Sequence, residues 1–300
     1  MAKSNVFSGM SFRRALLLCL PLLVAIVSEN AAATEAQPDR QKQRYEAAII
    51  LAERGDRDAQ LEIGLMYLNG DGVEQSNAMA GSWFRKAAEN GSARAVVEIY
   101  RLYSNGKATA YANEQNVAVI KKMARKGQGA SQIMLGLMYQ EGGYGIQKDE
   151  VEAFRWVQRA AEQGYSLAEG LLGAAYADGI GTQRDPEKAK MWFQRGAEHG
   201  DPVSQYQMGI RYLTGDGVAR DPQKAFLLLQ QAADGDFPSS KTALGLMYGI
   251  GIGTPVDKKR AIELLRKAAG EGDAEGKVYL DQLLKNGVIE RLPEKFRQQK

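Results

Sequence analysis

The chain has 300 residues, of which 44% are hydrophobic, 25% charged and 8% aromatic, and its formal net charge is +3 at pH 7. This composition excludes wholesale disorder and a protein of many membrane spans, and the length suits two ordinary domains or one elongated array. The single cysteine excludes an internal disulfide framework, a thiolate zinc site and a Cys-x-x-Cys redox centre. Glycine is in excess, with 33 residues in 300 against a usual share of about 7%.

Residues 1–33 have the order of a secretory signal peptide. A basic start with Lys3, Arg13 and Arg14 precedes the apolar run Ala15–Val27, and small residues at Ala31–Ala33 supply a cleavage site. The run is shorter than the ~20 residues that a membrane-spanning helix needs, so an uncleaved anchor is the weaker alternative. We therefore expect a periplasmic or secreted protein, cleaved after Ala33, with no stable membrane insertion.

Cleavage would also change the charge argument. The segment carries three basic residues and one acid, so its removal lowers the net charge from +3 to +1. The mature chain would contain no cysteine, and its charge gives no reason to expect nucleic acid as a partner. We expect a linker over residues 34–43 and an alanine-rich capping helix over residues 44–58.

Residues 59–272 contain an internal repeat. Tyrosine recurs at spacings of 36 or 37 residues, usually with glycine three positions earlier and a Gly-x-Gly turn after it. A helix-starting Asp or Ser, an alanine, a large apolar residue and a second alanine follow at fixed places. The three tryptophans share the large apolar position. The structural repeat positions are Tyr67, Trp83, Tyr139, Trp156, Tyr176, Trp192, Tyr212 and Tyr248.

Each unit is thus predicted to be helix A, a glycine turn, helix B and a second turn. One such hairpin cannot bury its apolar face alone, so six units must stack. The second unit is divergent, because Tyr100 replaces the glycine and its tryptophan is missing. Residues 273–300 are expected to form a C-terminal capping helix and a basic tail.

The order and spacing of these residues resemble the Sel-one-like repeat (SLR) family, a relative of the tetratricopeptide repeats. The resemblance covers roughly residues 60–272. It implies an all-α fold, a right-handed superhelical α/α solenoid. It also implies that variable positions of helix A line a concave groove that holds a protein partner.

No set of residues in the sequence builds a catalytic, cofactor or metal site. Ser104 starts the only Ser-x-x-Lys match, but at the end of a helix A, whereas penicillin-interacting enzymes place that serine at a helix start. The sole histidine, His199, precedes Gly200 at a helix end, where a capping role fits better than catalysis. We expect no enzyme activity and no cofactor.

The candidate partner-binding residues come from helix A and from tyrosines outside the repeat register. Methionine makes an adaptable contact surface, although packing between helices is an equal alternative for these methionines. Tyrosines in the divergent unit and in the widened third turn could anchor an interface, or reflect drift. The candidates are Glu62, Met66, Tyr100, Leu102, Tyr111, Met134, Met138, Tyr144, Gln207, Arg211 and Met247.

The sequence therefore predicts a non-enzymatic scaffold or regulator that binds another protein. Two alternatives stay open: a cell-wall-directed enzyme such as a β-lactam hydrolase, and a carbohydrate or peptidoglycan binder that uses exposed tyrosines. The identity of the partner and the oligomeric state are open as well.

Overall fold

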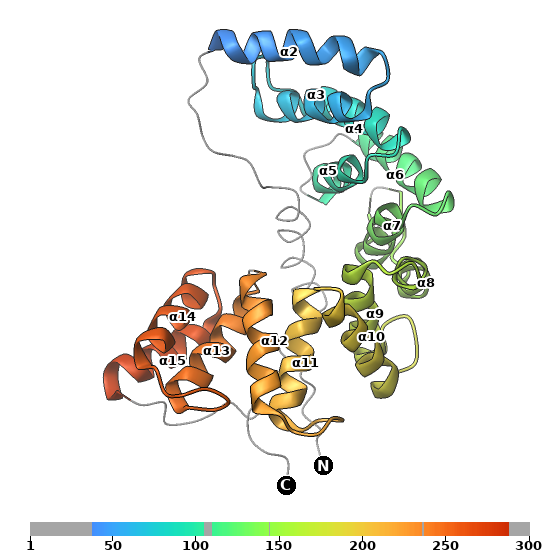
Figure 1. The fold of residues 1–300 in the computed structure, drawn as a ribbon. Helices are drawn as coiled ribbons and strands as arrows, with labels where there is room; N and C mark the ends of the chain where they lie inside the picture. The colour runs from blue at the N-terminus through green and yellow to red at the C-terminus, as the bar shows by residue number, and fades with distance from the viewer. Residues whose placement is uncertain (1–37, 105–109, 144, 236, 288–300) are drawn as a thin grey trace. The chain divides into compact units, whose positions relative to one another are not determined.

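The computed structural model describes residues 38–104, 110–143, 145–235 and 237–287, which form two compact units. The N-terminal unit holds the described residues up to Gln163 and the C-terminal unit those from Gly164. All regular structure in the described ranges is helical (Figure 1). The N-terminal helices are α2 (Pro38–Glu53), α3 (Arg57–Asn69), α4 (Asn77–Glu89), α5 (Ala93–Ser104), α6 (Ala110–Arg125), α7 (Gly129–Glu141) and α8 (Glu150–Glu162).

The C-terminal unit continues the same pattern. Its helices are α9 (Ser166–Asp178), α10 (Pro186–Glu198), α11 (Pro202–Thr214), α12 (Pro222–Asp234), α13 (Pro238–Ile250), α14 (Lys258–Gly270) and α15 (Ala274–Asn286). Consecutive helices pack on one another as hairpins, and each hairpin packs on the next within its unit. The fold is therefore the expected α/α solenoid of repeats.

In five of the six units helix B begins where the sequence predicts it. The N-cap side chains accept backbone N–H groups of the following turn, and the N-cap N–H donates to the repeat tyrosine's carbonyl at 2.8–2.9 Å. This second bond closes the loop between the two helices. The N-caps are Ser76, Asp149, Asp185, Asp221 and Asp257.

Glycine lets helix A approach helix B closely in five of the six units. A methyl group on Gly173 would stand 2.7 Å from the ring of Phe193, and one on Gly245 would stand 2.8 Å from Leu265. Gly64, Gly136 and Gly209 face helix B in the same way. The glycine excess therefore has a packing role here, beside its role in turns such as Gly70, whose φ of 82° is left-handed.

The divergent second unit solves the same packing problem differently. Tyr100, at the glycine position, is completely buried. A tyrosine ring at this position leaves no room for helix A and helix B to pack as closely as in the other units. Accordingly, α5 and α6 make few direct contacts with each other, and α6 also packs on α4 and α7. Asn116 replaces the first helix B alanine, and its Oδ1 accepts a hydrogen bond from Arg85 at 2.9 Å.

The tryptophans are buried, as their repeat position predicts. Trp83, Trp156 and Trp192 are 6–8% exposed. A basic side chain one turn later covers each ring, with Lys86 3.8 Å from the Trp83 centroid and Arg159 4.4 Å from that of Trp156. The cation closes the solvent edge of the ring, so these tryptophans serve packing and not an open surface.

The N-terminal cap starts earlier than expected. α2 begins at Pro38, so the linker prediction is wrong for residues 38–43; residues 34–37 lie outside the described residues. Proline suits the first position of a helix, because it lacks a backbone N–H and an N–H at that position would make no hydrogen bond within the helix. α2 is held on α3 by a 3.0 Å hydrogen bond between the hydroxyls of Tyr45 and Tyr67, which is the main cause that raises the pKa of Tyr45 to about 12.

The C-terminal cap is a helix A without a following helix B among the described residues. α15 packs on α13 and α14, with Tyr279 and Leu283 buried. The predicted signal peptide and basic tail lie outside the described residues.

Candidate binding surface

Most of the predicted helix A contact positions point into the molecule. Tyr100, Met134, Met138 and Met247 are at most 1% exposed, and Met66, Leu102 and Gln207 are buried as well. The expectation that these side chains lie on the surface is wrong, because the helix A positions beside the core face are also buried in the core. The methionines pack between helices, the alternative that the sequence left open.

Two of the remaining candidates are partly accessible. The side chain of Glu62 is 35% exposed and pairs with Arg44. Arg211 lies 5.1 Å from the ring centroid of Phe193, and burial lowers its pKa. Tyr144 and the side chain of Tyr111 lie outside the described part of the structure.

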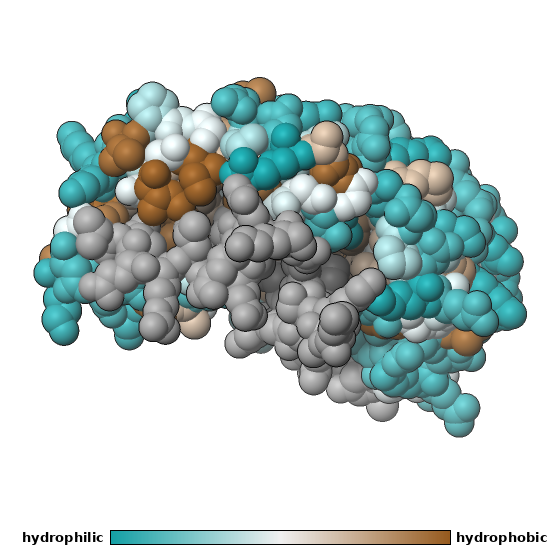
Figure 2. Space-filling view, turned by 90° about the horizontal axis from the view of Figure 1, so that it is seen from below, coloured by the Kyte–Doolittle hydropathy of each residue, from teal (hydrophilic) through white to brown (hydrophobic). Residues whose placement is uncertain are grey.

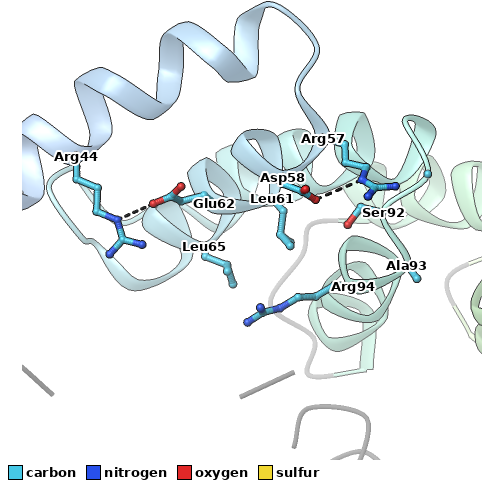
Figure 3. A pocket seen from close by; sticks show the side chains of 10 residues that line it. Arg44, Arg57, Asp58, Leu61, Glu62, Leu65, Ser92, Ala93 and Arg94 are labelled. Atoms are coloured by element: carbon cyan, nitrogen blue, oxygen red, sulfur yellow. Dashed lines mark hydrogen bonds and ion pairs between the residues drawn. The ribbon is translucent and has the colours of Figure 1, made fainter. Parts of the chain in front are cut away.

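A groove in the N-terminal unit contains one of these candidates. It has a volume of about 600 Å³ and lies between α2, α3 and the turn that leads from α4 into α5 (Figure 3). The wall from α2 and α3 is made by Arg44, Arg57, Asp58, Leu61, Glu62 and Leu65, and the turn contributes residues 91–94. The groove thus opens on the helix A side of the first two units.

The charges of the groove are arranged around an apolar strip. Figure 3 shows Leu61 and Leu65 between two ion pairs, Arg44–Glu62 on one side and Arg57–Asp58 on the other. The Arg44 Nε lies 2.6 Å from a Glu62 oxygen, and the Arg57 Nε lies 3.3 Å from Asp58. A fifth charge, Arg94, projects from the start of α5.

Comparison with known proteins decides the family. The Sel1 repeat model matches residues 57–92, 129–165, 166–201, 202–237 and 238–273, more than half of the chain. The chain belongs to the Sel1 repeat family. The unmatched stretch between the first two matches is the divergent second unit, the one with Tyr100 in place of glycine.

Solved structures agree with this assignment. A protective antigen of uropathogenic Escherichia coli with an SLR fold is 32% identical, with a TM-score of 0.62 over 84% of this chain; the chain spans only 54% of that protein. A Sel1 repeat protein from Oxalobacter formigenes is 29% identical, with a TM-score of 0.51, over 86% of this chain and 89% of the other. No curated protein sequence matches the chain significantly. Sel1 repeat proteins are generally protein-interaction scaffolds.

A polar tie inside four of the Sel1 repeats varies in chemistry from one to the next. It joins the fourth residue of helix A to the C-cap residue of helix B. The ties are Gln60–Asn90 at 2.9 Å, Gln132–Gln163 at 2.7 Å, Glu169–His199 at 2.7 Å and Lys241–Glu271 at 2.6 Å. The same contact is made by two amides in two repeats, by an acid and a histidine in a third, and by a lysine and an acid in a fourth. Because the position is the same and the chemistry differs, we infer that the contact stabilises the fold. His199 therefore has a structural partner.

The fourth repeat adds further buried acid around this tie. Glu169 is fully buried, and its other oxygen lies 2.6 Å from Arg195. The next helix starts at Asp201, also buried, which accepts the Ser204 backbone N–H at 2.7 Å. Burial raises the pKa of Asp201 to about 7, and the nearby Glu169 adds to the rise. The cluster is packed shut, because methyl groups on Gly170 or Gly196 would collide with Asp201 or Ser204.

Other site chemistry is absent from the described residues. Within those ranges no three His, Cys, Asp or Glu side chains gather as metal ligands, and no helix has the length and apolar character to cross a bilayer. Ser104 is the last residue of α5, at the C-terminal end of that helix.

Exposed apolar side chains lie singly or in one small group on the part of the chain that the structure describes. Figure 2 shows brown side chains gathered at the end of the molecule where Figure 1 places α13 to α15. Val256, Val278 and Leu284 of this region are 53–57% exposed. Single exposed apolar residues are ordinary on a protein surface and do not by themselves mark a binding site.

Sequence reasoning missed the arginines of the groove. Arg57 and Arg94 stand in the first turn of a helix A, where the helix dipole disfavours a positive charge. That unfavourable placement, repeated in the first two units, is a signal that the sequence carries. Arg44 offers no such signal, because it lies inside α2, away from the first turn of that helix.

Proposed function

We propose that this Sel1 repeat protein is a non-enzymatic scaffold or regulator that acts in the periplasm or outside the cell. It would bind a partner protein through the helix A side of its N-terminal repeats. The observation that carries the proposal is the groove of about 600 Å³ between α2, α3 and the start of α5. It combines an apolar strip with charged walls, the mixture that protein-binding surfaces use.

The rigidity of the groove supports this role. Its wall helices are fixed by buried neighbours: Ala48 and Ala52 of α2 pack with Ile63, Met66 and Trp83 in one cluster. A preorganised surface loses little conformational entropy when a partner binds. A scaffold built in this way can therefore hold a partner segment without refolding.

The location is proposed from the first 33 residues, whose basic start, apolar run and small residues have the order of a signal peptide. The similar Escherichia coli protein is a protective antigen. A location outside the cytoplasm for our chain would agree with that description.

Neither alternative function gains support. A β-lactam hydrolase would need an activated nucleophile, but Ser104 ends its helix and so lacks the favourable field of a helix start. A carbohydrate binder would need exposed aromatic rings beside a groove, whereas the candidate Tyr100 is buried and the exposed Tyr165 does not line the groove.

Affinity capture followed by reconstitution tests the proposal. The tagged full-length chain is used as bait on extract of the source cells, beside an unrelated exported protein with the same tag. We expect a specific partner that binds again, by calorimetry, when both proteins are pure. Repeated failure to recover any specific partner would count against a scaffold role.

A further inference from the structure

The groove between α2, α3 and α5 has a positive charge without an internal partner. Arg94 lines it and makes no hydrogen bond or ion pair with another described residue. Its side chain is half-buried at the beginning of α5, so it is held near the groove and is not free to sweep through solvent. Three arginines and two carboxylates line the groove, leaving one positive charge in excess.

The two internal ion pairs are of the kind that exchanges partners easily. The side chains of Arg44 and Arg57 are 71% and 54% exposed. Ion pairs this exposed are weak, because water screens both charges. A carboxylate from a ligand can therefore replace Asp58 or Glu62 on either arginine at little cost.

The space between the arginines is apolar. Leu61 and Leu65 lie on one face of α3 between the two ion pairs (Figure 3). Leu61 is almost completely buried and Leu65 half-buried. A ligand that spans the groove would place an apolar group on the leucines and negative groups beside the arginines.

We propose that this groove binds an extended acidic peptide segment of the partner, with carboxylates on either side of an apolar side chain. The proposal rests on the proposed scaffold function and specifies the chemistry of the partner. A basic segment would meet three arginines, and a nucleic acid backbone has no apolar side chain to place on the leucines. An acidic, partly apolar peptide contacts the leucines and supplies the negative charge that Arg94 lacks.

Fluorescence polarisation with a defined probe tests the proposal. The probe is a labelled peptide of sequence Asp-Leu-Glu-Asp-Leu-Glu, and its control is Asn-Leu-Gln-Asn-Leu-Gln, which keeps the apolar groups and removes the charge. We expect the full-length chain to bind the acidic peptide at least about tenfold more tightly, a difference of about 1.4 kcal/mol. The difference should shrink as salt is added, because exposed charges are screened.

The variant Arg94→Glu tests whether the acidic peptide binds in the groove. It should weaken binding of the acidic peptide about tenfold or more, while an acid in the first turn of α5 is compatible with folding. Arg125→Glu is the matched control, since Arg125 is an exposed arginine of the same unit that does not line the groove. Circular dichroism of both variants checks that the helices are intact.

Two results would overturn the inference. One is equal affinity for the acidic and the neutral peptide. The other is an Arg94→Glu protein that binds the acidic peptide as tightly as Arg125→Glu does. If either result is obtained while affinity capture still recovers a specific partner, only the acidic-peptide inference is wrong and the scaffold function stands. If the capture fails, it is the scaffold function that is contradicted.

Discussion

Replacing Gly173 by alanine tests whether glycine in helix A is a packing requirement of the solenoid. The new methyl group would stand 2.7 Å from Cδ1 of Phe193, whereas carbon atoms in contact prefer about 3.5–4.0 Å. The Phe193 side chain is completely buried and cannot turn away into solvent. α9 and α10 would therefore have to separate.

The magnitude is a balance of two effects. Overpacking a core costs about 1–3 kcal/mol, and replacing a helical glycine by alanine returns up to about 1 kcal/mol. We expect Gly173→Ala to lower the free energy of unfolding by about 1–2 kcal/mol, measured by urea denaturation followed by circular dichroism.

Gly81→Ala is the matched control in α4. Its methyl group would meet Leu102 at 3.5 Å, an ordinary contact, so only the gain in helix propensity applies. We expect that variant to be as stable as the wild type or up to about 1 kcal/mol more stable. If Gly173→Ala were stabilising to the same degree as Gly81→Ala, the close-approach argument would be refuted.

Three further predictions concern stability, pH and activity. Trp156→Ala should cost about 3–5 kcal/mol in urea denaturation because the ring is buried; a change within error would mean that the ring does not pack. Burial raises the pKa of Asp201 to about 7. Between about pH 4 and 7 the folded protein therefore keeps a proton on this carboxyl that the unfolded chain has lost. The free energy of unfolding should then fall as the pH rises through this range. Asp201→Asn should remove that dependence, and its stability relative to wild type should grow from pH 4 to pH 7; a constant difference would contradict the assignment. Fluorescent penicillin should leave the chain unlabelled, and a band that Ser104→Ala abolishes would restore the enzyme alternative.

The repeats could be predicted from the sequence because each rests on local chemistry. An N-cap such as Asp185 followed by proline, and a glycine three residues before a tyrosine, fix a helix boundary and a contact within one hairpin. Five matching copies of the pattern support one another. Helix starts and buried tryptophans are accordingly confirmed.

The surface could not be predicted in the same way. Exposure depends on which neighbouring helix covers a residue, and the helix A positions of Met138 and Met247 are covered on more sides than a single helical face indicates. Tyr100 shows the same difficulty, since only the altered packing of α5 and α6 makes room for its ring. The start of α2 was predicted too late because Pro38 reads equally well as a linker residue or as a first helical residue.

Site-specific photo-crosslinking measures most directly whether the groove holds a partner. A benzoylphenylalanine in place of Leu65, on the groove wall, is compared in the source cells with one in place of Arg125, on the same unit but outside the groove. The account predicts a discrete adduct with a partner protein from position 65, absent from position 125 and lost when Arg94→Glu is added. An adduct from position 125 alone, or none from either position, would contradict it.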